Sequence, residues 1–323
     1  MEYVTLGRTG LSVSPLCLGT MSFGGDADEE TSGKLFARCR EAGINFFDCA
    51  NIYSRGKAEE ILGRLAKPCR DQLILTSKVW GVMGPGPNDR GLSRRTVFMQ
   101  VEASLRRLQT DRLEIYFLHH RDPKTPAEET LRAMDELVRQ GKVLHVGISN
   151  WSAWQIALGL GQCEREGLAS IHVLQPMYSL VKRAAEIEIL PLAAEQRLGV
   201  IPYSPLGAGL LTGKYSASRR DEKGRLATNA MYVKRYADPA ILQIAQRFTD
   251  YAAKVAVHPA TLAVAWVKAH PAVTAPIIGA RNLEQLEPSL AAADYVMSPQ
   301  QYAEIAALTP PPPLATDRDE ERS

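Results

Sequence analysis

Residues 115–149, IYFLHHRDPKTPAEETLRAMDELVRQGKVLHVGIS, alternate between two kinds of hydrophobic pattern. The two ends of this segment, residues 115–119 and 143–149, are mostly apolar, as strands are when both faces are covered. The part between them begins with Pro126 and two acidic residues, a typical first helical turn, and ends at Gly141. A strand, a helix and a strand in succession predict two parallel strands joined by a crossover helix.

The same alternation extends through most of the chain. Residues 95–108 predict another amphipathic helix, because apolar side chains recur there every three or four positions. Further strand-like runs lie at residues 16–19, 44–49, 73–79, 173–177, 200–204 and 276–279, which brings the number of predicted strands to eight. Eight β–α units without a change in composition predict an α/β protein, a single (β/α)8 TIM barrel over residues 1–309. An open doubly wound sheet is the alternative, but the first strand lacks the glycine-rich phosphate loop of that fold.

Four segments add to this plan. A small hairpin is predicted over residues 4–14, with its turn at residues 8–10. Residues 212–237 are polar, basic and too long for a routine connection. Additional C-terminal helices are predicted over residues 238–270, with a break at His258 and Pro259. The last segment, residues 310–323, begins with four prolines and continues with charged residues, so we expect it to be disordered.

Composition narrows the functional classes. The 38 basic and 36 acidic residues give a net charge of only +2, which argues against nucleic-acid binding. Five scattered cysteines without a CxxC pair are typical of a reducing compartment. The N-terminus lacks the pattern of a secretion signal, and no apolar run reaches the ~20 residues of a membrane helix. We therefore expect a cytoplasmic protein that contacts neither nucleic acid nor membrane.

Four proton-handling side chains lie at or just after the ends of consecutive predicted strands: Asp48, Tyr53, Lys78 and His119. In a barrel these strand ends converge on one rim. A free phenol titrates near ~10, so we predict that Lys78 lowers the pKa of Tyr53 and that Asp48 keeps Lys78 protonated. His119 would hydrogen-bond the substrate oxygen or share in proton transfer.

Each of these four residues also has a purely structural interpretation. Asp48 and Lys78 would then be an ion pair, and Tyr53 and His119 would be packed side chains. His119 and His120 are neighbours on a strand, so their side chains point to opposite faces and do not chelate one ion. We predict no metal site.

Three segments together resemble the aldo-keto reductase family. Residues 43–53, GINFFDCANIY, match its GxNxxDxAxxY pattern, residues 76–79, TSKV, look like its catalytic-lysine strand, and residues 115–119 look like its histidine strand. The resemblance runs from about residue 6 to residue 290. It implies that Tyr53 is the general acid, that Lys78 and Asp48 tune it, and that His119 shapes the carbonyl site.

The resemblance also implies a bound NADP(H). Ser149, Asn150 and Gln175 would hold the nicotinamide carboxamide, and Tyr203 would stack on the nicotinamide ring. At the adenosine end, a helix start and Arg281 would favour a 2′-phosphate. The other cofactor residues implied are Gly19, Thr20, Met21, Ser204, Pro205, Leu206, Gly209, Lys214, Gly279 and Gln285.

Several of these assignments have structural alternatives. Ser149 and Asn150 could instead cap the next helix, Tyr203 could belong to the core, and Arg281 could be a solvated side chain. The chain also departs from the family at two positions, since Ser289 stands where relatives often have asparagine and Ala58 stands where serine is common.

The expected reaction is NADPH-dependent reduction of a small aldehyde or ketone to the alcohol. Trp80, Met83 and His120 would line the substrate pocket, or else pack a loop. The alternative function is a non-catalytic NADP(H)-binding regulatory subunit, similar to the β subunits of potassium channels. The sequence leaves the substrate and the oligomeric state open.

Overall fold

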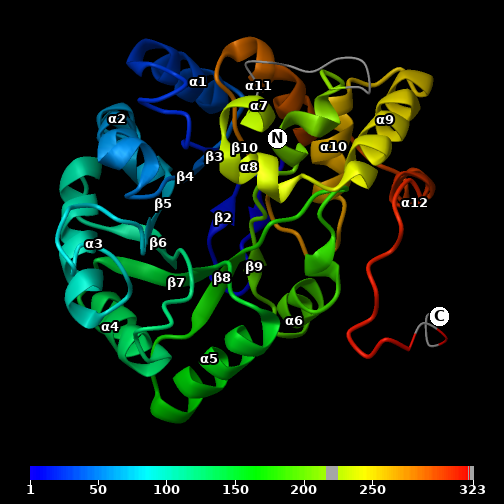
Figure 1. Cartoon of the computed structure of the whole chain (residues 1–323). Helices are drawn as coiled ribbons and strands as arrows, with labels where there is room; N and C mark the ends of the chain where they lie inside the picture. The colour runs from blue at the N-terminus through cyan, green and yellow to red at the C-terminus, as the bar shows by residue number, and fades with distance from the viewer. Residues whose placement is uncertain (216–224, 319, 321–323) are drawn as a thin grey trace.

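Eight parallel strands form the centre of the molecule. The computed structural model describes residues 1–215, 225–318 and 320. In it the strands follow the order β10-β3-β4-β5-β6-β7-β8-β9, with helices around them (Figure 1). Their bounds are β3 Cys17–Gly19, β4 Phe46–Asp48, β5 Ile74–Val79, β6 Leu113–Leu118, β7 Val143–Ser149, β8 Ile171–Gln175, β9 Gly199–Val200 and β10 Ile277–Ile278. The fold is the predicted (β/α)8 barrel.

Backbone hydrogen bonds close the sheet between its two end strands. The amides of Thr274 and Ala275 donate to the carbonyl of Val200 at 2.8 and 3.2 Å, and the amide of Ile277 donates to Pro202 at 2.9 Å. On the other side, β10 pairs with β3. The predicted strands at residues 200–204 and 276–279 are therefore present but shorter: β9 includes only Val200 of the first segment, and β10 includes Ile277 and Ile278 of the second. Tyr203 adds an isolated bridge to Met177.

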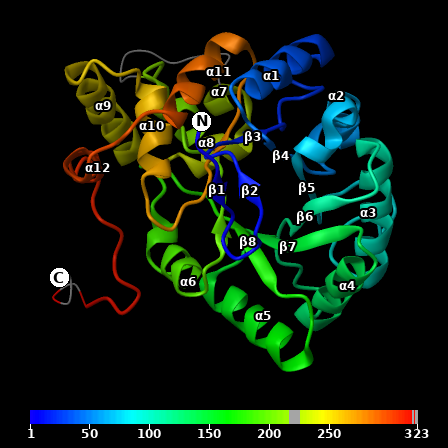
Figure 2. The same cartoon turned by 180° about the vertical axis from the view of Figure 1, so that it is seen from behind.

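An antiparallel hairpin covers the opposite end of the barrel from the strand C-termini. It consists of β1 Val4–Thr5 and β2 Ser12–Val13, as predicted, and Figure 2 shows it in front of the strands. Leu6 and Val13 pack into the inner core with side chains such as Phe46 and Phe117. The fit is close, because a Cβ on Gly7 would lie 2.2 Å from the backbone nitrogen of Gly199. The hairpin side chains thus fill the barrel interior at the end opposite the strand C-termini.

The helices start and stop at recognisable signals. Ser93 accepts a hydrogen bond from the amide of Thr96 at the start of α3, and Pro126 and Gly141 flank α4 as predicted. The surrounding helices are α1 Glu29–Glu41, α2 Lys57–Ala66, α3 Arg94–Leu108, α4 Ala127–Arg139, α5 Ala153–Glu166, α6 Ile189–Glu195, α10 Pro259–Lys268 and α11 Leu283–Leu290.

The C-terminal half carries helices beyond the eight repeats. They are α7 Arg225–Thr228, α8 Ala230–Arg235, α9 Pro239–Lys254 and α12 Pro299–Ala306. The predicted break at His258 and Pro259 is confirmed, since α9 ends before it and α10 begins at it. Within the predicted long connection, residues 216–224 lie outside the described residues, as do residues 319 and 321–323 of the predicted disordered tail. No helix in the described ranges combines the length and the apolar content that a membrane crossing requires.

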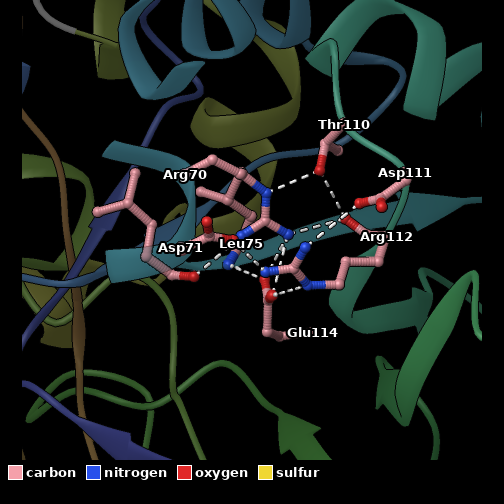
Figure 3. Close-up of polar contacts among 8 residues, drawn as sticks. Arg70, Asp71, Leu75, Thr110, Asp111, Arg112 and Glu114 are labelled. Carbon is pink, nitrogen blue, oxygen red and sulfur yellow. Dashed lines mark hydrogen bonds and ion pairs between the residues drawn. The ribbon is translucent and has the colours of Figure 1, made fainter. Parts of the chain in front are cut away.

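A buried carboxylate organises the polar contacts at the start of β5 and β6. Glu114 is 4% exposed and accepts hydrogen bonds from Arg70 at 2.9 and 3.0 Å and from the amide of Leu75 at 2.8 Å. Arg112 approaches the same carboxylate at 3.4 Å (Figure 3). A buried charge needs such partners, and this set fixes two neighbouring strands at the end of the barrel away from the strand C-termini.

Candidate active site

The C-terminal ends of β4, β5 and β6 bring the four predicted catalytic residues together. Asp48 is the last residue of β4 and pairs in register with Thr76 of β5. Lys78 lies two residues further along β5, and His119 follows the last residue of β6. Tyr53 returns to the same place through the short helix η1, Tyr53–Gly56. Strand geometry thus collects residues that are up to 71 positions apart, from Asp48 to His119.

Lys78 is the centre of the group. Its Nζ donates to Asp48 Oδ2 at 2.5 Å, to the carbonyl of Cys49 at 2.7 Å and to the Tyr53 phenol oxygen at 3.2 Å. The side chain is completely buried. An ammonium has three donors, and these three contacts use all of them. Tyr53, Asp48 and Lys78 are therefore held as one hydrogen-bonded unit.

Asp48 is fixed by neutral donors as well as by the lysine. Its Oδ1 accepts a hydrogen bond from Thr76 Oγ1 and another from Gln175 Nε2, both at 2.8 Å. The carboxylate is 2% exposed, so these bonds replace water. The sequence analysis assigned no role to Thr76, although its spacing of two from Lys78 places both side chains on one strand face.

The pKa of Tyr53 differs from the expectation. Burial raises the pKa of this phenol to about 12, and the Lys78 charge opposes the rise without overcoming it. The predicted direction of the lysine's influence is correct, but the prediction of a net lowered pKa is wrong because desolvation of the phenolate dominates. At neutral pH the phenol therefore keeps its proton.

Lys78 and His119 each keep one protonation state at neutral pH. Burial alone would lower the pKa of Lys78, but the charge of Asp48 and then Tyr53 hold the pKa above its ordinary value. Burial, reinforced by Lys78 and His120, holds the pKa of His119 well below its ordinary value. The imidazole is thus neutral and has one N–H to donate. Its ring lies edge-on to Tyr53, with the centroids 6.3 Å apart.

Aromatic rings line the rim next to the catalytic group. His120 lies between His119, with ring centroids 5.1 Å apart, and Trp80, with centroids 4.6 Å apart. The prediction that His119 and His120 point to opposite faces is wrong, because β6 ends at Leu118 and strand alternation no longer applies to the two residues. Trp80 is 37% exposed, and the amide of Met83 is bonded to the carbonyl of Asp89 in the loop that follows. Trp80 and His120 are thus brought together at the rim, and Met83 belongs to a hydrogen-bonded turn beside them.

The predicted nicotinamide end forms a continuous polar chain. Tyr203 Oη donates to Asn150 Oδ1 at 2.7 Å, Asn150 Nδ2 donates to Ser149 Oγ at 2.9 Å, and Ser149 Oγ donates to the carbonyl of Gln175 at 2.9 Å. A pocket of about 250 Å³ is lined by Asn150, Gln175 and Tyr203 among others. The structure does not support Ser149 or Asn150 as the cap of α5, because Ser152 is the N-cap residue and its amide donates to Gln155 Oε1 at 3.0 Å.

The predicted adenosine end gathers where β10 leads into α11, beside the end of β3. A Cβ on Gly279 would lie 3.6 Å from the carbonyl of Gly19. The amide of Arg281 donates to Gln285 Oε1 at 3.3 Å, and Asn282 caps the first turn of α11.

Three further residues named in the sequence analysis have defined places. Thr20 Oγ1 donates to the carbonyl of Asp48 at 3.0 Å. Beside it, Met21 is exposed. Ser289, at the asparagine position, is fully buried.

A glycine-rich turn follows β9. Ser204, Gly207, Ala208 and Gly209 all have positive φ values in the segment that contains Pro205 and Leu206. A Cβ on Gly209 would lie 2.7 Å from the Lys214 side chain. Consecutive residues in such conformations direct backbone amides toward one side, as in anion-binding turns.

These residues fit a nicotinamide dinucleotide chemically. The amides and hydroxyls of Ser149, Asn150 and Gln175 can bond a carboxamide, and an aromatic ring lies beside them. Cationic side chains at Lys214 and Arg281, together with the start of α11, suit phosphates. In the part of the chain that the structure describes, no three His, Cys, Asp or Glu side chains gather in a way that could hold a metal ion.

Comparison with known proteins agrees with this geometry. The family model for the Aldo/keto reductase family matches residues 15–310. Uncharacterized oxidoreductase YrpG of Bacillus subtilis is 41% identical over 305 residues, 91% of each chain. Probable voltage-gated potassium channel β subunits of Arabidopsis thaliana and Oryza sativa are 36% and 35% identical, over 92% and 98% of this chain and 92% and 99% of theirs. The chain therefore belongs to the aldo/keto reductase family of oxidoreductases.

Proposed function

We propose that the protein reduces a small aldehyde or ketone to the alcohol with NADPH, and that Tyr53 is the general acid. The observation that carries the proposal is the buried unit in which Lys78 bonds both Asp48 and the Tyr53 phenol. An ion pair that served only stability would not need a tyrosine hydroxyl as its third member. We also propose a cytoplasmic location, where NADPH and small carbonyl compounds are available.

The proton step follows from the acidities of donor and acceptor. NADPH, when bound, supplies the hydride, so the carbonyl oxygen becomes as basic as an alkoxide. Burial raises the pKa of Tyr53 to about 12, still below the roughly 15.7 of water, an ordinary O–H acid. Transfer of the phenol proton to the alkoxide oxygen is therefore downhill. Lys78, 3.2 Å from the phenol oxygen, stabilises the phenolate that remains.

His119 orients the carbonyl. Because its imidazole is neutral, its free N–H can donate to the substrate oxygen without competing as an acid. Its ring lies beside Tyr53, so both groups can reach one oxygen. The rim formed by Trp80 and His120 then contacts the rest of the substrate, and its aromatic surface suits an apolar or aromatic group.

The cofactor residues determine the orientation of the nicotinamide. Ser149, Asn150 and Gln175 would bond the carboxamide, and Tyr203 would stack on the nicotinamide ring. Lys214 and the turn from Ser204 to Gly209 would hold the pyrophosphate. Gly279, Arg281 and Gln285 would hold the adenosine end, with Arg281 on the 2′-phosphate.

A second candidate function is supported by the two plant relatives, whose names describe probable channel β subunits. In that case the chain would bind NADP(H) as a regulatory subunit with no turnover. The complete catalytic group favours an enzyme.

One experiment separates the two functions. Purified protein is mixed with NADPH and a panel of aldehydes, ketones and sugar-derived carbonyls, and the absorbance of the reduced nicotinamide is followed. We expect steady consumption that depends on the carbonyl compound. Tight NADPH binding without turnover on any carbonyl compound would favour the regulatory function, and the absence of binding would contradict both.

A further inference from the structure

The turn that carries Tyr53 has a strained backbone. Ser54 and Arg55 adopt φ values of 46° and 53°, and Gly56 follows with 92°. Side chains other than glycine, asparagine and aspartate rarely occupy this left-handed region, and such residues persist only where surrounding contacts hold them. The contacts that hold this turn should therefore matter for the position of the phenol.

A buried ion pair adjoins the turn. Glu59 in α2 is completely buried, and its carboxylate accepts hydrogen bonds from Arg107 Nε at 2.6 Å and from Ser77 Oγ at 2.5 Å. Arg107 comes from α3 and packs against Gly56, where an added Cβ would lie 2.9 Å from its Cδ and Nε. The pair thus connects two helices, one strand and the last residue of η1.

Ser77 links this pair to the catalytic strand. Successive strand side chains point to opposite faces, so Thr76 and Lys78 bond Asp48 on one face of β5 while Ser77 bonds Glu59 on the other. Glu59 lies in the first turn of α2, three residues after Gly56. The position of α2 relative to Lys78 is therefore set by a contact that does not involve the reacting groups.

Two further contacts hold the same loop. Asn51 Nδ2 donates to Gln100 Oε1 of α3 at 3.1 Å, and Ser54 Oγ donates to the carbonyl of Phe23 at 2.8 Å. These neutral contacts fix the beginning and middle of the turn, and Arg107 covers its end. A charged pair is the strongest element of this set.

We propose that Glu59 and Arg107 are positioning residues, which hold the strained turn so that the Tyr53 phenol stays within hydrogen-bond distance of Lys78. This inference rests on the proposed function, because it assigns the pair a role in the same proton transfer. Neither side chain touches the reacting atoms. Without the pair the turn relaxes, and the phenol moves away from the ammonium.

The informative variant is the double substitution E59Q/R107M. It removes the pair without leaving one buried charge alone, which would destabilise the fold strongly. The chain offers a matched control in Arg70 and Glu114, a second buried Arg–Glu pair that also contacts β5 but at its other end (Figure 3). The control variant is E114Q/R70M.

We expect E59Q/R107M to lower kcat roughly 10- to 100-fold, as a displacement of about 1 Å in a reacting group does, while KM for NADPH stays unchanged. The control should keep the wild-type kcat. A mere loss of folded protein would lower the concentration of active enzyme, which NADPH titration measures, and would leave kcat per active site unchanged.

Two results would overturn the proposal: a folded E59Q/R107M protein with the wild-type kcat, or an equal loss of kcat in the control. If the double variant does not fold, R107K decides in the same way, because lysine keeps the charge but cannot reproduce the planar contact with Gly56. Crystal structures give a readout independent of activity. A Tyr53–Lys78 separation that stays at the 3.2 Å of the wild type would contradict positioning even if the wild type reduced no carbonyl.

Discussion

The side-chain amide of Gln175 donates a hydrogen bond to Oδ1 of Asp48 across 2.8 Å. The two residues end β8 and β4, which lie four places apart in the ring of eight strands. The bond therefore spans the barrel mouth and joins the predicted nicotinamide side to the catalytic side.

Gln175→Leu should impair both stability and turnover, because it removes a neutral donor from a buried carboxylate. A hydrogen bond to a charged group contributes about 1.5–3 kcal/mol, so we expect the free energy of unfolding to fall by that amount. Turnover should fall roughly tenfold, which corresponds to about 1.4 kcal/mol in the barrier. Denaturant titration and steady-state kinetics measure the two effects. Unchanged values in both would show that Thr76 and Lys78 suffice to hold Asp48.

Tyr53→Phe should remove most carbonyl reduction and leave NADPH binding nearly unchanged. The substitution deletes the proton donor but keeps the ring and its packing. General-acid catalysis contributes ~10²–10⁴ in rate, so the loss should appear in kcat. Fluorescence titration with NADPH serves as the control for binding. A folded variant that retains kcat within a few-fold of wild type would show that Tyr53 is not the proton donor and would indicate His119 instead.

Lys78→Met should damage turnover about as much as Tyr53→Phe, because the phenolate loses the ammonium 3.2 Å away. The double variant should be hardly worse than either single variant, since residues that act as one unit are not additive. The four kcat values of the double-mutant cycle (wild type, two single variants and the double variant) test this directly. Additive losses would mean that Lys78 and Tyr53 act in separate steps.

Arg281→Ala should erode the preference for NADPH over NADH. Arg281 stands at the start of α11, and a charge-assisted contact to a 2′-phosphate contributes about 1.5–3 kcal/mol, or roughly ten- to a hundred-fold in affinity. We expect the Kd for NADPH to rise by that factor and the Kd for NADH to stay constant. Equal wild-type affinities for the two cofactors would contradict the assignment.

Stability should fall as the pH drops below 6.5, in part because of His172. Burial, the neighbouring His145 and Arg8 lower the pKa of His172 to about 4, so the unfolded chain binds a proton between pH 6.5 and 4 that the folded chain does not. The free energy of unfolding therefore rises as the pH rises. We expect His172→Asn to reduce the loss between pH 7 and pH 5 by about 1–2 kcal/mol. A parallel pH dependence in wild type and variant would show that His172 titrates normally.

The sequence predicted the strands and their order because buried parallel strands need nearly continuous apolar runs. It also predicted where Asp48, Lys78 and His119 would meet, since parallel strands end on one rim. The pKa of Tyr53 could not be predicted in the same way. Its direction depends on whether burial outweighs Lys78, and only the three-dimensional positions decide between them.

The long-range polar contacts could not be predicted from the sequence either. Glu59 and Arg107 lie on different helices, and neither shows a local pattern that would name the other as a partner. The bond from Gln175 to Asp48 joins residues 127 positions apart, and no local pattern in the sequence links them. The strained conformation of Ser54 and Arg55 has no signal in residue type, since neither residue favours positive φ values.

The pairing of β3 with β10 also has a consequence for how the protein is made. β3 can pair with β4 once residue 48 is made, but it meets its other neighbour, β10, only after residue 278 has left the ribosome. The ring therefore closes only after all eight strands have been synthesised. The catalytic group lies between residues 48 and 119 and can assemble early, whereas Gly19 and Gly279 come together last. Contacts of such high sequence separation form slowly. A ligand that bridges β3 and β10 would bind only the closed ring and would stabilise it by mass action. If NADPH is that ligand, as proposed above, it should slow the opening of the closed ring and leave the rate of its formation unchanged.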